Sequence, residues 1–225
     1  MRRPFLPLLV PAVLALPAAF IYVGGWATIS VDELPEQLVA GRPVELSFVV
    51  RQHGVSPLGK LRPRVEARSG RLEAEVAALP GAGEGRYRAA LTVPEAGSWT
   101  ITIHSGFGRG RTRLLPIRAV AAGTRVAAAA VPDYERGHGL FLAKGCADCH
   151  VHRAVDDEPE AAVGPELTAR RFQAGYLARF LADPSIGAST PNPNSDMKMP
   201  DPGLKPAEIT ALVAFLNGGA RQAAR

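Results

Sequence analysis

Two cysteines and a histidine within five consecutive residues constrain this chain of 225 residues more than any other feature. Cys146 and Cys149 are its only cysteines, and His150 follows the second directly. Residues three apart lie on one face of a helical turn, so both thiols can reach the two vinyl groups of one haem and form thioethers with them. The adjacent imidazole is then placed against the iron as its proximal ligand. The pentapeptide therefore predicts one haem c, attached covalently through both cysteines.

Three other uses of the two cysteines compete with haem attachment. A structural disulfide would suit an oxidising compartment, but it does not require His150. A thioredoxin-like redox pair is typical of a neighbouring βαβ pattern, which is absent from this sequence. Zinc could take both thiols together with His150 or His152, yet the sequence supplies no convincing fourth ligand. We expect His152, two residues past the predicted iron ligand, to be exposed.

The first 27 residues have the features of an export segment. Arg2 and Arg3 precede an uncharged stretch, residues 4–30, that is rich in Leu, Val, Ala and Phe. A positive start before an apolar run directs a chain to the export machinery. The run is about long enough to span a bilayer, for which roughly 20 apolar residues are needed. We therefore predict that residues 1–27 are a signal peptide or a membrane anchor, and that the protein is periplasmic or tethered to the membrane facing the periplasm.

Residues 28–118 have the pattern of an all-β domain. Short runs rich in Val, Ile, Thr and aromatic residues alternate with Gly- and Pro-containing turns. Residues 98–104 alternate with the period of two that is typical of a half-buried strand. Short strands separated by turns over this length favour a β-sandwich. The four predicted strands are 28–31, 44–51, 86–93 and 98–104.

Four short segments of this region carry a resemblance to a known family. They are Asp32-Glu33-Leu34-Pro35, Gly41-Arg42-Pro43-Val44-Glu45-Leu46, Gly85-Arg86-Tyr87 and Pro94-Glu95-Ala96-Gly97-Ser98-Trp99. With them the region resembles the YtkA-like (FixH-like) immunoglobulin-fold domains of bacterial exported proteins. The resemblance implies an immunoglobulin-like sandwich and says more about the fold than about an activity. An Ala-rich linker, residues 119–132, follows this predicted domain.

Residues 133–219 place the cysteine motif between two predicted helices. Asp133 is positioned to cap the first helix, and residues 205–218 carry the apolar stripe of an amphipathic second one. Together with the motif, these helices resemble class I (monohaem) cytochrome c. That resemblance implies an all-α cytochrome c fold, with residues 220–225 as a tail.

The resemblance also implies where the two helices touch. In the family the first and last helices cross with a small residue at the contact. Gly137, Phe141 and Phe215 match the positions at that crossing.

The resemblance further implies the partners of the iron and of its histidine. In the family a Met in a loop ahead of the last helix is the sixth ligand, commonly as Met-Pro. Met199, followed by Pro200, matches this pattern, and Met197 is the fallback. The segment Gly164-Pro165-Glu166-Leu167 resembles the one in which the Pro carbonyl accepts the ring N–H of the proximal histidine, so Pro165 is expected to orient His150.

The sixth ligand separates two classes of function. A haem closed by His and Met favours a higher potential and leaves no free coordination position. Such a protein carries single electrons between redox proteins and is not an enzyme. An open or displaceable sixth position would instead make it a haem enzyme or a small-ligand sensor, and the Met199-Pro200 loop favours the carrier. The sequence has no nucleic-acid-binding signature.

A narrower alternative concerns the predicted β domain. His53 and His104 could approach each other there and bind copper, as an accessory protein for metal-oxidase assembly would. This idea depends on analogy at the level of the fold.

Overall fold

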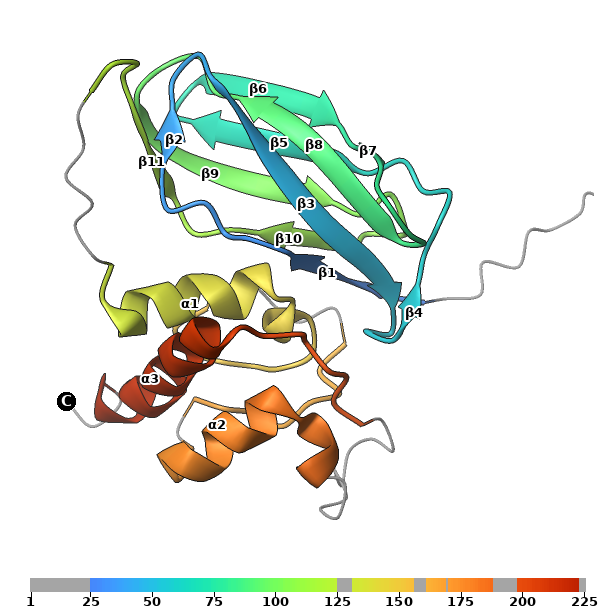
Figure 1. Ribbon diagram of the computed structural model, residues 1–225, viewed down its shortest axis with the longest axis vertical. Coiled ribbons are helices and arrows are strands. Elements are labelled where there is room, and N and C mark those ends of the chain that lie inside the picture. Colours follow the sequence, from blue (N-terminus) through green and yellow to red (C-terminus); the bar gives the residue numbers. More distant parts are fainter. Residues whose placement is uncertain (1–24, 125–130, 156–160, 169, 188–197, 223–225) are drawn as a thin grey trace, which may run out of the picture.

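The computed structural model describes residues 25–124, 131–155, 161–168, 170–187 and 198–222 (Figure 1). Residues 1–24, which hold most of the predicted export segment, lie outside these ranges, as does Met197. Within the described ranges, no helix combines the length and the apolar character that crossing a membrane requires. Strands occupy the N-terminal part of the chain and helices the C-terminal part, as the sequence predicted.

The N-terminal part consists of two β-sheets. The first has the order β1-β3-β8-β7, with β4 paired to β3, and the second has the order β2-β11-β9-β5-β6, with β10 paired to β9. Every described pair is antiparallel except β2 with β11. The strands are β1 Ala27–Val31, β2 Leu38–Val39, β3 Pro43–Gln52, β4 Ser56–Pro57, β5 Arg64–Ser69, β6 Leu72–Ala77, β7 Leu79–Pro80, β8 Arg86–Thr92, β9 Gly97–His104, β10 Arg111–Arg113 and β11 Ile117–Val120.

Alternating side chains hold the two sheets together. On β9, Trp99, Ile101 and Ile103 are fully buried between the sheets, while their neighbours along the strand are more exposed. On β1 the inward residues Ala27, Ile29 and Val31 are buried in the same core. Because successive side chains of a strand point to opposite faces, the other face of β1 is left to contact the helical part of the chain.

Of the second sheet, the sequence predicted β9 alone; β2, β5, β6, β10 and β11 were absent from the prediction. β2, β10 and β11 are only two to four residues long. β5 and β6 are longer, but charged residues occupy their outer face and the inward stripe of β5 is only Val65 and Ala67.

Cross-strand ion pairs explain these charges, because Arg64 lies 2.6 Å from Glu75 and Arg68 lies 3.1 Å from Glu73. Arg68 lies directly opposite Glu73, and opposed charges of opposite sign stabilise a pair of strands. Arg64 lies opposite Ala77 and reaches Glu75 diagonally.

The C-terminal part is a small helical unit. α1 and α3 pack across each other, and α2 lies against α3 (Figure 1). The predicted cap at Asp133 is wrong: Pro132 occupies the cap position without a side-chain hydrogen bond, and Asp133 is the first residue of the helix. There its charge still favours the positive end of the helix dipole. The elements are α1 Asp133–Ala143, η1 Cys146–Asp148, α2 Ala174–Ala182, η2 Pro184–Gly187 and α3 Pro206–Gln222.

Gly137 lies at the crossing of α1 and α3. A Cβ atom at this position would lie 2.0 Å from the carbonyl oxygen of Ala211 and 2.7 Å from Cβ of Phe215. Phe141 and Phe215 are both buried beside it, with ring centroids 5.5 Å apart. The close approach of the two helices therefore depends on the missing side chain.

We expect Gly137→Val to destabilise the helical unit by more than the roughly 1–3 kcal/mol usual for overpacked cores, because the clash is with backbone. Thermal unfolding of the holoprotein measures this loss. Gly175→Ala is the matched control, since a Cβ atom on this glycine of α2 meets nothing within 4 Å. Equal unfolding temperatures for the two variants would contradict the crossing described here.

Candidate haem site

A single turn of chain presents both cysteines and His150. α1 ends at Ala143, and Gly145 turns the backbone with a φ of 76°, a conformation that favours glycine. The amide of Cys149 then donates to the carbonyl oxygen of Cys146 at 3.2 Å, and the amide of His150 donates to the same oxygen at 2.9 Å. These bonds close the turn and bring the three side chains to one stretch of surface.

The segment around Pro165 holds His150 in one orientation. Nδ1 of His150 donates to the carbonyl oxygen of Pro165 at 2.9 Å. The segment itself is fixed because the Gly164 amide donates to the Cys149 carbonyl oxygen and the Leu167 amide to the Val151 carbonyl oxygen, each at 2.9 Å. With its proton on Nδ1, the imidazole has its Nε2 lone pair free to bind a metal.

Burial keeps His150 neutral. It lowers the pKa of the imidazole below its usual range, and the nearby Arg170 lowers it further, while the hydrogen bond to Pro165 acts in the opposite direction. A neutral imidazole is the form that coordinates iron. Burial and the hydrogen bond to Pro165 thus both leave Nε2 of His150 unprotonated and able to bind iron.

The two cysteines are free thiols with little tendency to ionise. Burial raises the pKa of Cys146 to about 12, with the neighbouring Cys149 and Asp148 adding to the effect. Burial and Asp148 raise the pKa of Cys149 to about 12. A thioether carries no charge, so this environment suits covalent attachment of both sulfurs to haem.

Met199 lies in the segment leading to α3 and is half-buried. It packs against the apolar core of the helical unit, the same core that Cys146 touches. Pro200 follows it and faces Gly54 of the β domain. A thioether sulfur on this side of the site and an imidazole nitrogen on the turn are the two donors that a closed haem requires. These residues therefore fit haem c.

His152 is buried, and the prediction that it is exposed is wrong. Only 3% of it is accessible, and its ring lies against Phe215 and Phe141, with centroid separations of 4.5 and 5.8 Å. The Ala154 amide donates to its Nδ1 at 3.2 Å. Burial, with the nearby His138, lowers the pKa of His152. It is thus a neutral packing residue inside the helical unit.

The structure places His53 and His104 in different surroundings. His53 follows β3 of the first sheet and lies against Trp26, with ring centroids 5.5 Å apart. His104 ends β9 of the second sheet and faces Glu66 at 3.7 Å. In the ranges that the structure describes, the one group of three potential metal ligands is Glu66, Glu73 and Glu75. Two of these carboxylates are exposed, and arginines pair with all three.

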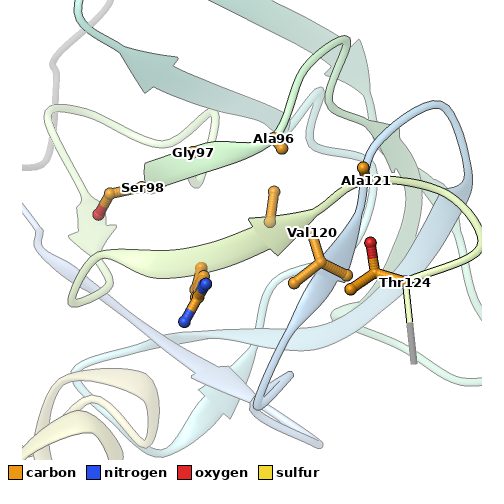
Figure 2. Close-up of a pocket in the computed structure, with 8 residues that line it drawn as sticks. Ala96, Gly97, Ser98, Val120, Ala121 and Thr124 are labelled. Atoms are coloured by element: carbon orange, nitrogen blue, oxygen red, sulfur yellow. The ribbon is translucent and has the colours of Figure 1, made fainter. Parts of the chain in front are cut away.

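A shallow hollow of about 530 Å³ lies on the β domain, away from these residues (Figure 2). It is bordered by the ends of β9 and β11, and Arg118 is its only charged lining residue. None of the haem-site residues lines it.

Sequence reasoning overlooked Lys144 and Asp148, which flank the attachment turn. Both are buried, and both are bonded to residues of the β domain or of α3. A charged residue next to the motif looks like a solvated one in sequence, and its partner on α3 is far along the chain.

We expect Gly164→Val to displace His150. A Cβ atom on Gly164 would lie 2.4 Å from the imidazole ring, so a side chain there must push the ring or break its bond to Pro165. The reduction potential should then rise, because an imidazole without its hydrogen bond to Pro165 is less basic and stabilises ferric iron less. Potentiometry of the holoprotein measures it, with Gly175→Val as the control, since a Cβ atom on this exposed glycine of α2 meets nothing within 4 Å. A potential equal to that of the unmodified protein would contradict this geometry.

Comparison with known proteins assigns the helical unit. Residues 134–219 match the cytochrome c family. The C-terminal part of the chain is therefore a cytochrome c domain. The family implies covalently bound haem c, and Cys146 and Cys149 fit its CxxC motif.

No curated protein matches the chain. Among solved structures, it is similar to domains 4 and 5 of the S-layer protein SbsC, at 22% identity and a TM-score of 0.32, over 42% of this chain and 51% of that one. It is also similar to the C-terminal domain of ZirS, at 14% identity and a TM-score of 0.30, over 53% and 87%. The chain thus spans about half the length of the SbsC fragment. TM-scores this low carry no weight for fold or function.

Proposed function

We propose that this protein carries single electrons through one haem c, in the bacterial periplasm or at the outer face of the membrane. The observation that supports it most is the turn that presents Cys146, Cys149 and His150 with Nδ1 of His150 bonded to the Pro165 carbonyl oxygen at 2.9 Å. An imidazole with a fixed tautomer changes its geometry little when the metal changes oxidation state, which suits electron transfer.

The ligand set supports a carrier in preference to an enzyme or sensor. His150 and Met199 would hold the iron, with Cys146 and Cys149 anchoring the porphyrin. When bound, the haem supplies a one-electron couple between ferrous and ferric iron. Met199 is half-buried and packs against the apolar core of the helical unit, which supports a fixed position for its sulfur.

The rest of the chain supports a location outside the cytoplasm. Residues 1–27 join two arginines to an apolar run, which is the composition of an export segment or anchor. The immunoglobulin-like reading of the β domain, whose two sheets enclose one core, agrees with a module of exported proteins. Donor and acceptor would be other redox proteins.

A potentiometric titration of the purified holoprotein tests the proposal. A carrier should show one reversible wave with the slope of a one-electron couple, identical in the oxidative and reductive directions. Turnover of peroxide or a stable complex with nitric oxide, accompanied by a non-reversible titration, would point to an enzyme or a sensor.

A further inference from the structure

An edge strand of the β domain contacts the haem attachment segment directly. The amide of Ile29 on β1 donates to Oδ2 of Asp148 at 3.3 Å, and Gly145 approaches the carbonyl oxygen of Ile29 so closely that a Cβ atom would lie 2.9 Å away. Oγ of Ser30 donates to the Lys144 carbonyl oxygen at 3.1 Å. Residues 144–148 thus cover the edge of β1 at Ile29 and bond its backbone amide.

Lys144 connects three elements from one buried position. Its Nζ lies 2.9 Å from Oε1 of Glu208 on α3 and donates to the carbonyl oxygen of Asp32, just beyond β1, also at 2.9 Å. The two paired side chains are 5% and 8% exposed. The second oxygen of Glu208 accepts the amide of Lys205 at the start of α3. A buried ion pair needs such additional bonds to offset its lost hydration.

A second contact of the β domain reaches the segment that holds Met199, the predicted sixth iron ligand. The turn after β3 places Gly54 against Pro200, and a Cβ atom on Gly54 would lie 3.3 Å from Cγ of that proline. The pKa of Arg51 on β3 is lowered mainly by burial, and Asp201 acts on it in the opposite direction, which places Asp201 near the same strand. Met199 therefore lies next to residues that the β domain contacts.

The two parts also share apolar packing. Leu34, just beyond β1, packs against the core of the β domain and against that of the cytochrome c domain. Ala143, the last residue of α1, is fully buried among the β-domain residues. The described contacts thus continue from one core to the other without a separating layer of water-exposed side chains.

We propose that the β domain is a positioning element of the haem site. It fixes the attachment segment through β1 and Lys144 and the Met199 loop through Gly54, and so keeps the two iron ligands at the spacing that holds the sixth position closed. This inference rests on the proposed ligation by His150 and Met199. Ser30, Lys144 and Gly54 act on the iron only through other residues.

A bulky substitution on the β domain tests this positioning role without altering a haem-site residue. Ser30→Trp places a bulky side chain on the face of β1 that contacts Lys144. Ser98→Trp, at an exposed position on β9, is the matched control. In the full-length holoproteins, we expect Ser30→Trp to bind carbon monoxide in the ferrous state, to lose the weak red band of Met-to-iron coordination and to have a lower potential. Ser98→Trp should match the unmodified protein in all three.

A second variant covers the case in which Ser30→Trp does not fold. Lys144→Met combined with Glu208→Leu replaces the ion pair with apolar side chains of similar volume, which often preserves stability. It also removes the bond to the Asp32 carbonyl oxygen. We expect the same gain of carbon monoxide binding and the same fall in potential.

If folded Ser30→Trp or the double variant keeps the potential, the red band and the resistance to carbon monoxide of the unmodified protein, the β domain has no positioning role. Failure of the proposed function is distinguished by the unmodified protein itself, which would then bind carbon monoxide. The difference in potential between Ser30→Trp and Ser98→Trp would still decide the positioning role.

Discussion

Replacing Cys146 and Cys149 together with serine should yield a protein that has no covalently bound haem. Serine cannot form the thioethers, and no other cysteine exists in the chain to replace them. We expect no haem signal at the mass of the polypeptide on a denaturing gel. Each single serine variant is the control, because one thioether should remain and keep haem on the chain.

The double cysteine variant should also lose its helical unit while keeping its β domain. Cys146 and Met199 both pack against the core of the helical unit, so a haem bound by them would add packing to that unit, and its loss would remove these contacts. The β domain has a separate core built on Trp99 and Phe48. Circular dichroism should therefore show a loss of helix with the sheet signal preserved. Covalent haem in the double variant would contradict attachment through these two thiols.

Replacing Met199 with alanine should open the iron. The ferrous variant should bind carbon monoxide, because no other side chain described near the site supplies a sulfur donor. Its potential should fall by a sizeable part of the roughly 0.8 V range over which axial ligands set haem potentials. The fall in potential follows from losing a thioether, a ligand that favours ferrous iron. Potentiometry and gas titration of the holoprotein measure them.

The control for Met199→Ala is Leu204→Ala, which removes a side chain of the same core without a possible iron ligand. Because Leu204 is half-buried, this variant should lose less stability than the roughly 2–5 kcal/mol typical of a fully buried leucine, and it should still resist carbon monoxide. A Met199→Ala protein that behaves in the same way would move the axial ligand elsewhere, with Met197 as the first candidate.

The cytochrome c part was predictable because its determinants are local. The attachment turn needs only Cys146, Cys149, His150 and a glycine before them, and all four are adjacent in sequence. The crossing of α1 and α3 was expected from the resemblance to class I cytochrome c, because Gly137 and Phe215 match the positions at which the first and last helices of that family meet, and Gly137 lies at this contact in the structure.

The charged strands were not predictable from local pattern. β5 and β6 have an outer face of Arg and Glu, and pairing of the strands brings Arg68 opposite Glu73. The inward stripe of β5 consists of only Val65 and Ala67, which is too short to identify a strand by its alternation. The pairing partner, not the strand's own sequence, decides the structure.

The buried polar groups around the site were missed for a related reason. Lys144 is buried because Glu208 and the Asp32 carbonyl oxygen meet it there, and neither is close to it in sequence. His152 is buried because its ring fits beside Phe215 of a distant helix. Residues of these types are mostly exposed unless a partner is present, so sequence alone favours the wrong answer.

The absorption spectrum of the purified holoprotein, ferric and ferrous, before and after carbon monoxide, tests the central claim most directly. A closed haem c held by His150 and Met199 predicts the low-spin spectrum of thioether-linked haem. It also predicts a weak red band from Met sulfur to ferric iron and no change when the gas is added to the ferrous protein. A high-spin spectrum that shifts with carbon monoxide would contradict the closed site and, with it, the assignment of this protein as an electron carrier.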